Sequence, residues 1–136
     1  ITQGGQIVEL KIPGTLYIYA DEVKIGQVIT NFLTNALKHT AAGQHITIQA
    51  YRKPDEETMH FEICDDGEGI PESELPYVWD RYHKTSRSFS RNQLNTGLGL
   101  AIVKAILDAH DAQYGVMSIV GKGSTFWFEL RETHEA

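Results

Sequence analysis

Cysteine, basic runs and long apolar segments are scarce or absent in this 136-residue sequence. A single cysteine, Cys64, excludes an internal disulfide framework and a multi-cysteine zinc site, and it favours a reducing compartment. No apolar stretch approaches the roughly 20 residues that span a bilayer. Twelve basic residues stand against eighteen acidic ones without a lysine or arginine run. This charge pattern argues against a general nucleic-acid-binding surface.

Two common nucleotide-binding signatures are also missing. The chain has no GxxxxGK[ST] phosphate loop, and no third glycine completes a dinucleotide-binding GxGxxG. The first residues lack the charge and apolar run of a signal peptide, and we expect the chain to be a segment of a longer protein. Its composition, 41% hydrophobic and 22% charged, is that of an ordinary globular domain. A domain of this length can bury enough apolar surface to be stable without a disulfide or a metal.

The hydrophobic pattern predicts a chain of alternating strands and helices. Strands are expected at 8–12, 16–20, 46–51, 59–63, 115–119 and 125–130, where apolar and polar residues alternate or form short runs. Helices are expected at 22–40, 71–80 and 99–110. Asp21 is the predicted N-cap of the first helix and Gly43 its predicted end, while the polar stretch 85–95 is a predicted surface loop.

This order of elements predicts the fold class. We expect one domain over residues 1–136, with a core over about 8–130. It is a two-layer α/β sandwich, in which a mixed, mostly antiparallel sheet of about five or more strands carries three helices on one face.

Polar side chains on the first predicted helix share one stripe. Asn31, Asn35 and Lys38 recur at four- and three-residue steps, beside the most apolar face. An amide oxygen can ligate Mg²⁺, and two amides with an ammonium suit a phosphate group. Taken alone, the stripe is equally compatible with an ordinary polar helix face.

Three glycine-bearing segments follow. Asp65-Asp66-Gly67-Glu68-Gly69-Ile70 comes directly after a strand, where a carboxylate can accept a hydrogen bond from a base amine. Thr96 to Ile102, TGLGLAI, places two glycines at a helix start, where free N–H groups favour phosphate. The third segment, 121–125, is a glycine turn. Singly, these are also compatible with an acidic turn, a weak GxG match and a plain hairpin.

In this order, the segments resemble the catalytic, ATP-binding domain of sensor histidine kinases, within the wider family shared with gyrase, heat-shock-90 and MutL ATPases. NFLTNALKHT is similar to the asparagine box, DDGEGI and TGLGLAI to the two glycine boxes, VWDRYHK to the aromatic box and GKGSTFWFEL to the closing segment. The resemblance covers about 8–130. It implies the Bergerat ATP-binding fold, with an ATP lid at about 81–96.

The resemblance also implies a role for each matching residue. Asp65 would accept the adenine amine, and Asn35 with Asn31 would hold Mg²⁺ and the phosphates. Asn31, Asn35 and Lys38 would be the catalytic residues. The implied nucleotide-binding residues are Asn31, Asn35, Lys38, His39, Asp65, Gly67, Gly69, Ile70, Arg81, Tyr82, Gly97, Leu98, Gly99, Leu100 and Thr125. His39 would flank the base, Thr125 would line its pocket, and ATP and Mg²⁺ would be the cofactors.

One position favours phosphotransfer over hydrolysis. ATP-hydrolysing relatives carry a glutamate as general base four residues before the metal-binding asparagine, where this chain has Asn31. An amide cannot take a proton from water, so hydrolysis should be slow. A neutral imidazole is already a nucleophile, so transfer to histidine needs mainly positioning and charge neutralisation.

The phosphoacceptor histidine is expected on a separate dimerisation domain that this chain lacks. Only His110 has an acidic residue directly after it, and its context is not that of a phosphoacceptor. His45, His60 and His134 are predicted at the surface. The resemblance implies three partners, namely ATP, the phosphoacceptor domain of the same kinase and a response regulator receiver domain. It further implies a cytoplasmic position within a membrane-anchored bacterial receptor, without nucleic-acid or membrane contact by this domain, which alone should be monomeric.

Two alternatives stay open at this point. One is a serine protein kinase of the anti-sigma type, which shares these boxes; a basic partner-binding surface would favour it. The other is a degenerate nucleotide-binding module without catalysis. The presence of Asn35, Asp65, Gly97 and Gly99 argues against the second.

Overall fold

The computed structural model describes residues 5–12, 20–55, 57–80 and 99–131. The strand predicted at 16–20 lies outside these residues except for its last position, and so do the polar loop at 85–95 and the expected ATP lid. Of the predicted site residues, Arg81, Tyr82, Gly97 and Leu98 also lie outside them.

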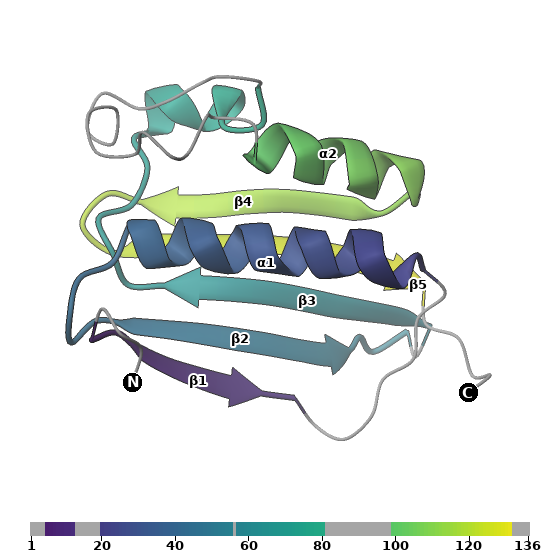
Figure 1. Ribbon diagram of the computed structural model, residues 1–136, viewed down its shortest axis with the longest axis horizontal. Helices are drawn as coiled ribbons and strands as arrows, with labels where there is room; N and C mark the ends of the chain where they lie inside the picture. The colour runs from purple at the N-terminus through teal and green to yellow at the C-terminus, as the bar shows by residue number, and fades with distance from the viewer. Residues whose placement is uncertain (1–4, 13–19, 56, 81–98, 132–136) are drawn as a thin grey trace.

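The predicted two-layer α/β sandwich is confirmed (Figure 1). The elements are β1 (Ile7–Lys11), α1 (Glu22–Lys38), β2 (His45–Arg52), β3 (Thr58–Asp65), η1 (Glu72–Tyr77), α2 (Gly99–Ala109), β4 (Gln113–Ile119) and β5 (Gly123–Arg131). The five strands form one sheet in the order β1-β2-β3-β5-β4. Among the described strands, β1 pairs in parallel with β2 and the other pairings are antiparallel, so the sheet is mixed as expected.

Helix α1 forms where the sequence predicts it. Its N-cap is Asp21, whose carboxylate accepts a hydrogen bond from the backbone N–H of Lys24 at 3.0 Å. The residues that it buries recur at three- and four-residue steps: Ile25, Val28, Phe32 and Ala36. The helix ends at Lys38 with His39 as C-cap, so Gly43 lies in the following turn rather than closing the helix.

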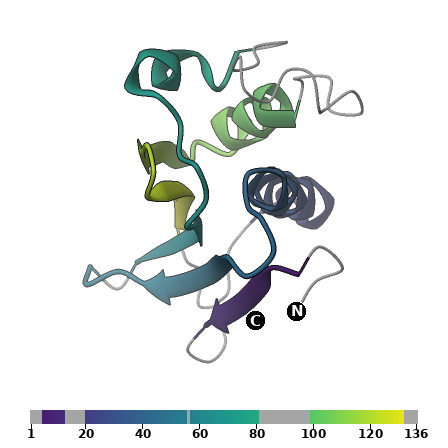
Figure 2. The same cartoon turned by 90° about the vertical axis from the view of Figure 1, so that its left-hand side faces the viewer.

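The helices lie on one side of the sheet, as the end-on view in Figure 2 shows. The core between the layers centres on Phe32, which is 1% exposed and whose ring lies 5.5 Å from that of Phe126 and 6.3 Å from that of Phe128. The predicted helix at 71–80 is instead the short 3-10 helix η1. Pro76 within it has no N–H to donate, which disfavours a regular α-helix. Trp79, after η1, joins the core beside Phe32.

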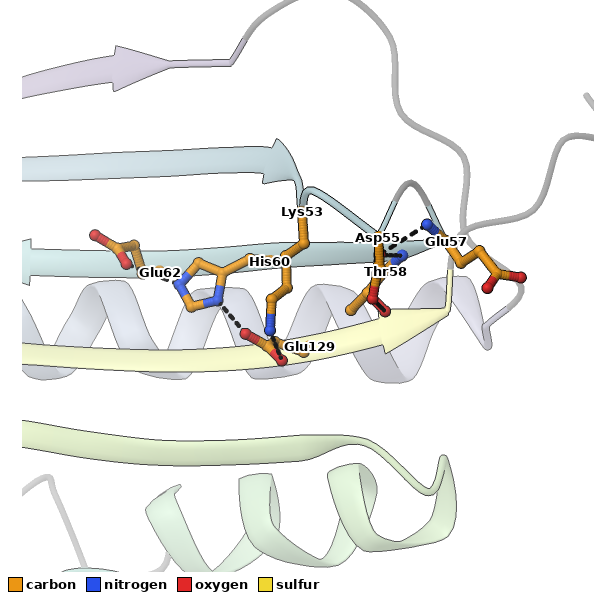
Figure 3. Close-up of polar contacts among 7 residues, drawn as sticks. All are labelled: Lys53, Asp55, Glu57, Thr58, His60, Glu62 and Glu129. Carbon is orange, nitrogen blue, oxygen red and sulfur yellow. Dashed lines mark hydrogen bonds and ion pairs between the residues drawn. The ribbon is translucent and has the colours of Figure 1, made fainter.

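The opposite face of the sheet carries a polar network (Figure 3). His60 lies between the rings of Tyr51 and Trp127, at centroid distances of 4.9 and 5.7 Å. Its Nδ1 is 2.7 Å from Glu129 and its Nε2 is 2.8 Å from Glu62. The prediction that His60 is a surface residue is wrong, because rings from two neighbouring strands cover it and leave it 8% exposed.

Candidate functional site

The predicted stripe on α1 faces the start of α2. The side-chain amide of Asn31 donates to the carbonyl of Gln27 at 3.0 Å. Its oxygen Oδ1 lies 3.2 Å from the position that a Cβ on Gly99 would take. The start of α2, where backbone N–H groups have no partner within the helix, therefore lies beside an amide oxygen from α1. Two motifs 68 positions apart in the chain meet here.

The other members of the stripe lie toward the end of α1. Asn35 and Lys38 are half-buried, and so is Leu100 in the first turn of α2. Lys38 also lines an open pocket of about 440 Å³ together with His39, Gly67, Glu68 and Gly121. The stripe thus extends from the start of α2 to the loop that follows β3.

Asp65 ends β3 and is the buried acid of the site, 8% exposed. Its Oδ1 accepts a hydrogen bond from the backbone N–H of Gly67 at 3.0 Å. Burial raises the pKa of the Asp65 carboxyl, although the Gly67 N–H and the nearby His39 act in the opposite direction. A buried carboxylate with remaining acceptor capacity is suited to a ligand that presents hydrogen-bond donors.

The loop after Asp65 is held tightly against α1. A Cβ on Gly67 would lie 2.0 Å from the carbonyl oxygen of His39, so only glycine fits there. The His39 ring is in turn 3.0 Å from a carboxylate oxygen of Glu68. On the far side, the backbone N–H of Gly121 donates to the carbonyl of Glu68 at 2.8 Å. Three segments distant in sequence therefore meet around this loop.

The structure places Thr125 on the other side of the sheet from Asp65. The cross-strand partner of Asp65 is Ser124, and the partner of Thr125 is Cys64. Because successive side chains of a strand point to opposite faces, Ser124 shares the face of Asp65, whereas the Thr125 hydroxyl donates to the Cys64 sulfur at 3.2 Å. The hydroxyl beside Asp65 is therefore that of Ser124, 6% exposed, which the sequence analysis missed.

The surroundings of Cys64 and His110 disfavour a chemical role for either side chain. Burial is the main cause that raises the pKa of the Cys64 thiol to about 11, so the thiolate nucleophile is disfavoured. The Nε2 of His110 accepts the backbone N–H of Asp21 at 3.1 Å, and its Nδ1 lies 2.8 Å from the carbonyl of Ile106. These partners place the proton on Nδ1 and occupy both nitrogens, which leaves none for a phosphoryl group.

No group of three or more histidine, cysteine or acidic side chains in the described residues could hold a metal ion. The candidate metal ligands are amides instead. Asn31 uses its nitrogen as a donor to Gln27, which leaves Oδ1 directed toward Gly99. A single amide oxygen fits Mg²⁺ that takes its other ligands from phosphate and water.

Comparisons with known proteins show which family the chain belongs to. Residues 20–134 match the family of histidine kinase-, DNA gyrase B- and HSP90-like ATPases. The chain belongs to this family. The sensor histidine kinase WalK of Bacillus subtilis is 38% identical over 115 residues, which is 85% of this chain and 19% of WalK. The sensor histidine kinase AruS of Pseudomonas aeruginosa is 41% identical over 106 residues, 76% of this chain and 11% of AruS.

Solved histidine kinases share the fold. The mycobacterial sensor histidine kinase MprB has a TM-score of 0.79 at 25% identity, covering 94% of this chain and 83% of that one. Full-length ShkA in complex with AMPPNP has a TM-score of 0.80 at 28% identity, covering 98% of this chain and 27% of ShkA. This member of the histidine kinase ATPase family is therefore a catalytic domain of the sensor histidine kinase type, for which the family implies ATP binding.

The histidine kinase domain spans about a fifth or less of the two curated relatives named above. Among the described residues, no helix is both long enough and apolar enough to cross a membrane.

Proposed function

We propose that this domain binds Mg-ATP and donates the γ-phosphate to a histidine on a separate dimerisation domain, as part of a two-component sensor kinase. The observation that carries the proposal is that two groups suited to different parts of ATP lie toward opposite ends of the stripe on α1. The buried Asp65 carboxylate lies at one end, and the start of α2 facing Asn31 lies at the other. The first suits a base amine and the second suits phosphate.

At the base end, Asp65 accepts the exocyclic amine of adenine. The Gly67 N–H fixes the carboxylate, and Ile70, 7% exposed at the end of the loop, would supply an apolar contact to the base. His39 borders the base, with its ring held by Glu68. The Ser124 hydroxyl supplies a second polar atom on the same face, the position that Thr125 was expected to fill.

Along α1, Asn31, Asn35 and Lys38 would serve the triphosphate, with Asn31 beside the start of α2 and Lys38 nearest the acidic loop. Asn31 and Asn35 would hold Mg²⁺ through their amide oxygens, and Lys38 adds positive charge. Bound Mg²⁺ neutralises charge on the phosphates. The backbone N–H groups at Gly99 and Leu100 contribute a positive helix end. The resemblance also gives nucleotide-binding roles to Arg81, Tyr82, Gly97 and Leu98, which lie outside the residues that the structure describes.

The side chain at position 31 favours phosphoryl transfer to histidine over ATP hydrolysis. Asn31 cannot act as general base for water, because its amide nitrogen already donates to Gln27 and neither amide atom takes a proton. A histidine nitrogen from the partner domain attacks the γ-phosphorus, the bond to the β–γ bridging oxygen breaks, and ADP leaves with those electrons. The residues of this chain position the nucleotide for that attack.

The length of the relatives supports the wider context. Because the chain covers only part of WalK and AruS, we propose that the phosphoacceptor histidine lies elsewhere in the same protein. A response regulator receiver domain would then take the phosphoryl group. The full protein is proposed to be a membrane-anchored receptor with this domain in the cytoplasm.

A transfer assay tests the proposal. The domain is incubated with Mg²⁺, ATP labelled at the γ-phosphate and a separate dimerising hairpin that carries a phosphoacceptor histidine. We expect acid-labile label on the hairpin, no label when its histidine is absent, and transfer faster than phosphate release. ATP binding without any transfer would favour the degenerate module, and alkali-labile label on serine would favour the serine-kinase alternative.

A further inference from the structure

Ser118 joins three segments that enclose Asp65. Its Oγ lies 2.7 Å from the backbone nitrogen of Ile70, 3.0 Å from the carbonyl oxygen of Gly123 and 2.7 Å from the Oγ of Ser124. Ile70 ends the acidic loop, whereas Gly123 and Ser124 begin β5. One hydroxyl on β4 therefore connects the exit of the loop to the strand beside it.

The three contacts determine where the hydroxyl protons lie. A serine hydroxyl has one proton to donate and two lone pairs. The Ile70 N–H can only donate to Ser118, and the Gly123 carbonyl can only accept from it. The single Ser118 proton is therefore used on Gly123. All three bonds form together only when Ser124 donates its own proton to Ser118, which leaves lone pairs of Ser124 for another partner.

Ser124 presents those lone pairs beside the buried acid. Asp65 and Ser124 are directly opposite each other on one face of the sheet, and they are 8% and 6% exposed. Cross-strand partners have Cβ atoms about 5 Å apart. The backbones of the loop and the turn around them are packed closely. A Cβ on Gly123 would lie 1.9 Å from the Asp65 carbonyl, and one on Gly69 would lie 2.4 Å from the Ile119 carbonyl.

We propose that Ser118 is a positioning residue that sets base specificity. By taking the proton of Ser124, it keeps that hydroxyl as a second acceptor next to the Asp65 carboxylate. A base that presents an amine meets two acceptors, whereas a base that presents a carbonyl at the same place meets two repelling oxygen atoms. This inference rests on the proposed function, in which Asp65 reads the base.

The test compares two nucleotides whose bases differ in carrying an amine or a carbonyl at the same position. ADP and inosine diphosphate, which has a carbonyl in place of the amine, are titrated into the wild-type domain and into Ser118→Ala. Freed from Ser118, the Ser124 hydroxyl can turn and donate to the carbonyl. We expect the preference for ADP to fall about three- to tenfold, the equivalent of one hydrogen bond. Ser73→Ala, an exposed position on η1, should keep the wild-type preference.

A second variant separates positioning from folding. Ser124→Ala removes the acceptor but leaves Ser118 bonded to Ile70 and Gly123, and it should lower the preference similarly. If Ser118→Ala does not fold, Ser124→Ala still tests the proposal. A wild-type preference in folded Ser118→Ala, or in Ser124→Ala, would overturn the proposal and leave Asp65 as the base reader. Failure of the wild-type domain to bind either nucleotide would overturn the proposed function as well.

Discussion

Two glycine-to-alanine substitutions should have opposite effects on this domain. At Gly67, a Cβ would lie 2.0 Å from the His39 carbonyl oxygen, whereas ordinary C···O contacts are about 3.3 Å or longer. Two backbone segments must then separate by more than about 1 Å. At Gly26, exposed in the interior of α1, the added carbon would meet no atom within 4 Å apart from its chain neighbours and the adjacent helix backbone.

The expected magnitudes follow from these surroundings. Overpacking of this kind costs about 1–3 kcal/mol, so Gly67→Ala should lower the free energy of unfolding by that amount. Alanine is a better helix former than glycine, so Gly26→Ala should raise it by about 0.5–1 kcal/mol. For a domain of this size, the first change corresponds to a fall in Tm of roughly 3–15 °C.

Urea and thermal unfolding of both variants, together with nucleotide titration, provide the assay. Gly67→Ala should also weaken ATP binding at least tenfold, because the N–H of residue 67 that fixes Asp65 is displaced. Gly26→Ala should bind ATP like the wild type. Equal stability and equal affinity of Gly67→Ala and wild type would refute the close contact between the acidic loop and the end of α1.

Further predictions concern the polar network of Figure 3 and the contact between His110, after α2, and Asp21, before α1. Burial raises the pKa of Glu129, but hydrogen bonds from His60 and Lys53 outweigh it and hold the pKa below its usual value. The stability that Glu129 contributes is therefore present above about pH 4.3, the ordinary glutamate value, and is lost as the pH falls through the lower folded-state pKa. Glu129→Gln should be less stable at pH 7 and should show a shallower loss of stability between about pH 5 and 3 in urea titrations; parallel curves would argue against the network. His110→Ala should cost about 1 kcal/mol and speed amide exchange at Asp21, with phosphotransfer unchanged; loss of transfer at wild-type stability would instead give His110 a chemical role.

The sequence predicted those parts of the domain that depend on local pattern. The apolar steps of α1, its Asp21 cap and the sheet hairpins are all visible in residue spacing. The carboxylate at the end of β3 was also predicted, because a strand pattern runs directly into the acidic loop.

What depends on contacts between distant segments could not be predicted. A shift of one residue in strand pairing turns a side chain to the other face, and spacing alone does not determine the register that places Ser124 rather than Thr125 beside Asp65. Likewise, strand alternation puts His60 on the polar face, but its burial requires Tyr51 and Trp127 from two other strands. The role of Ser118 could not be predicted either, because its hydroxyl contacts the acidic loop at Ile70 and the turn at Gly123.

Recognition of ATP through Asp65 is tested by calorimetric titration of the domain with a non-hydrolysable ATP analogue and Mg²⁺, for wild type and Asp65→Asn. Because burial raises the pKa of Asp65, its charged form is disfavoured in the folded domain, and Asp65→Asn should be at least as stable as wild type at pH 7. We predict saturable binding by the wild type that requires Mg²⁺ for full affinity, and loss of that binding in the folded variant. Unchanged binding by Asp65→Asn would contradict recognition of the base by Asp65, and no binding by the wild type at millimolar nucleotide would contradict ATP binding by the domain.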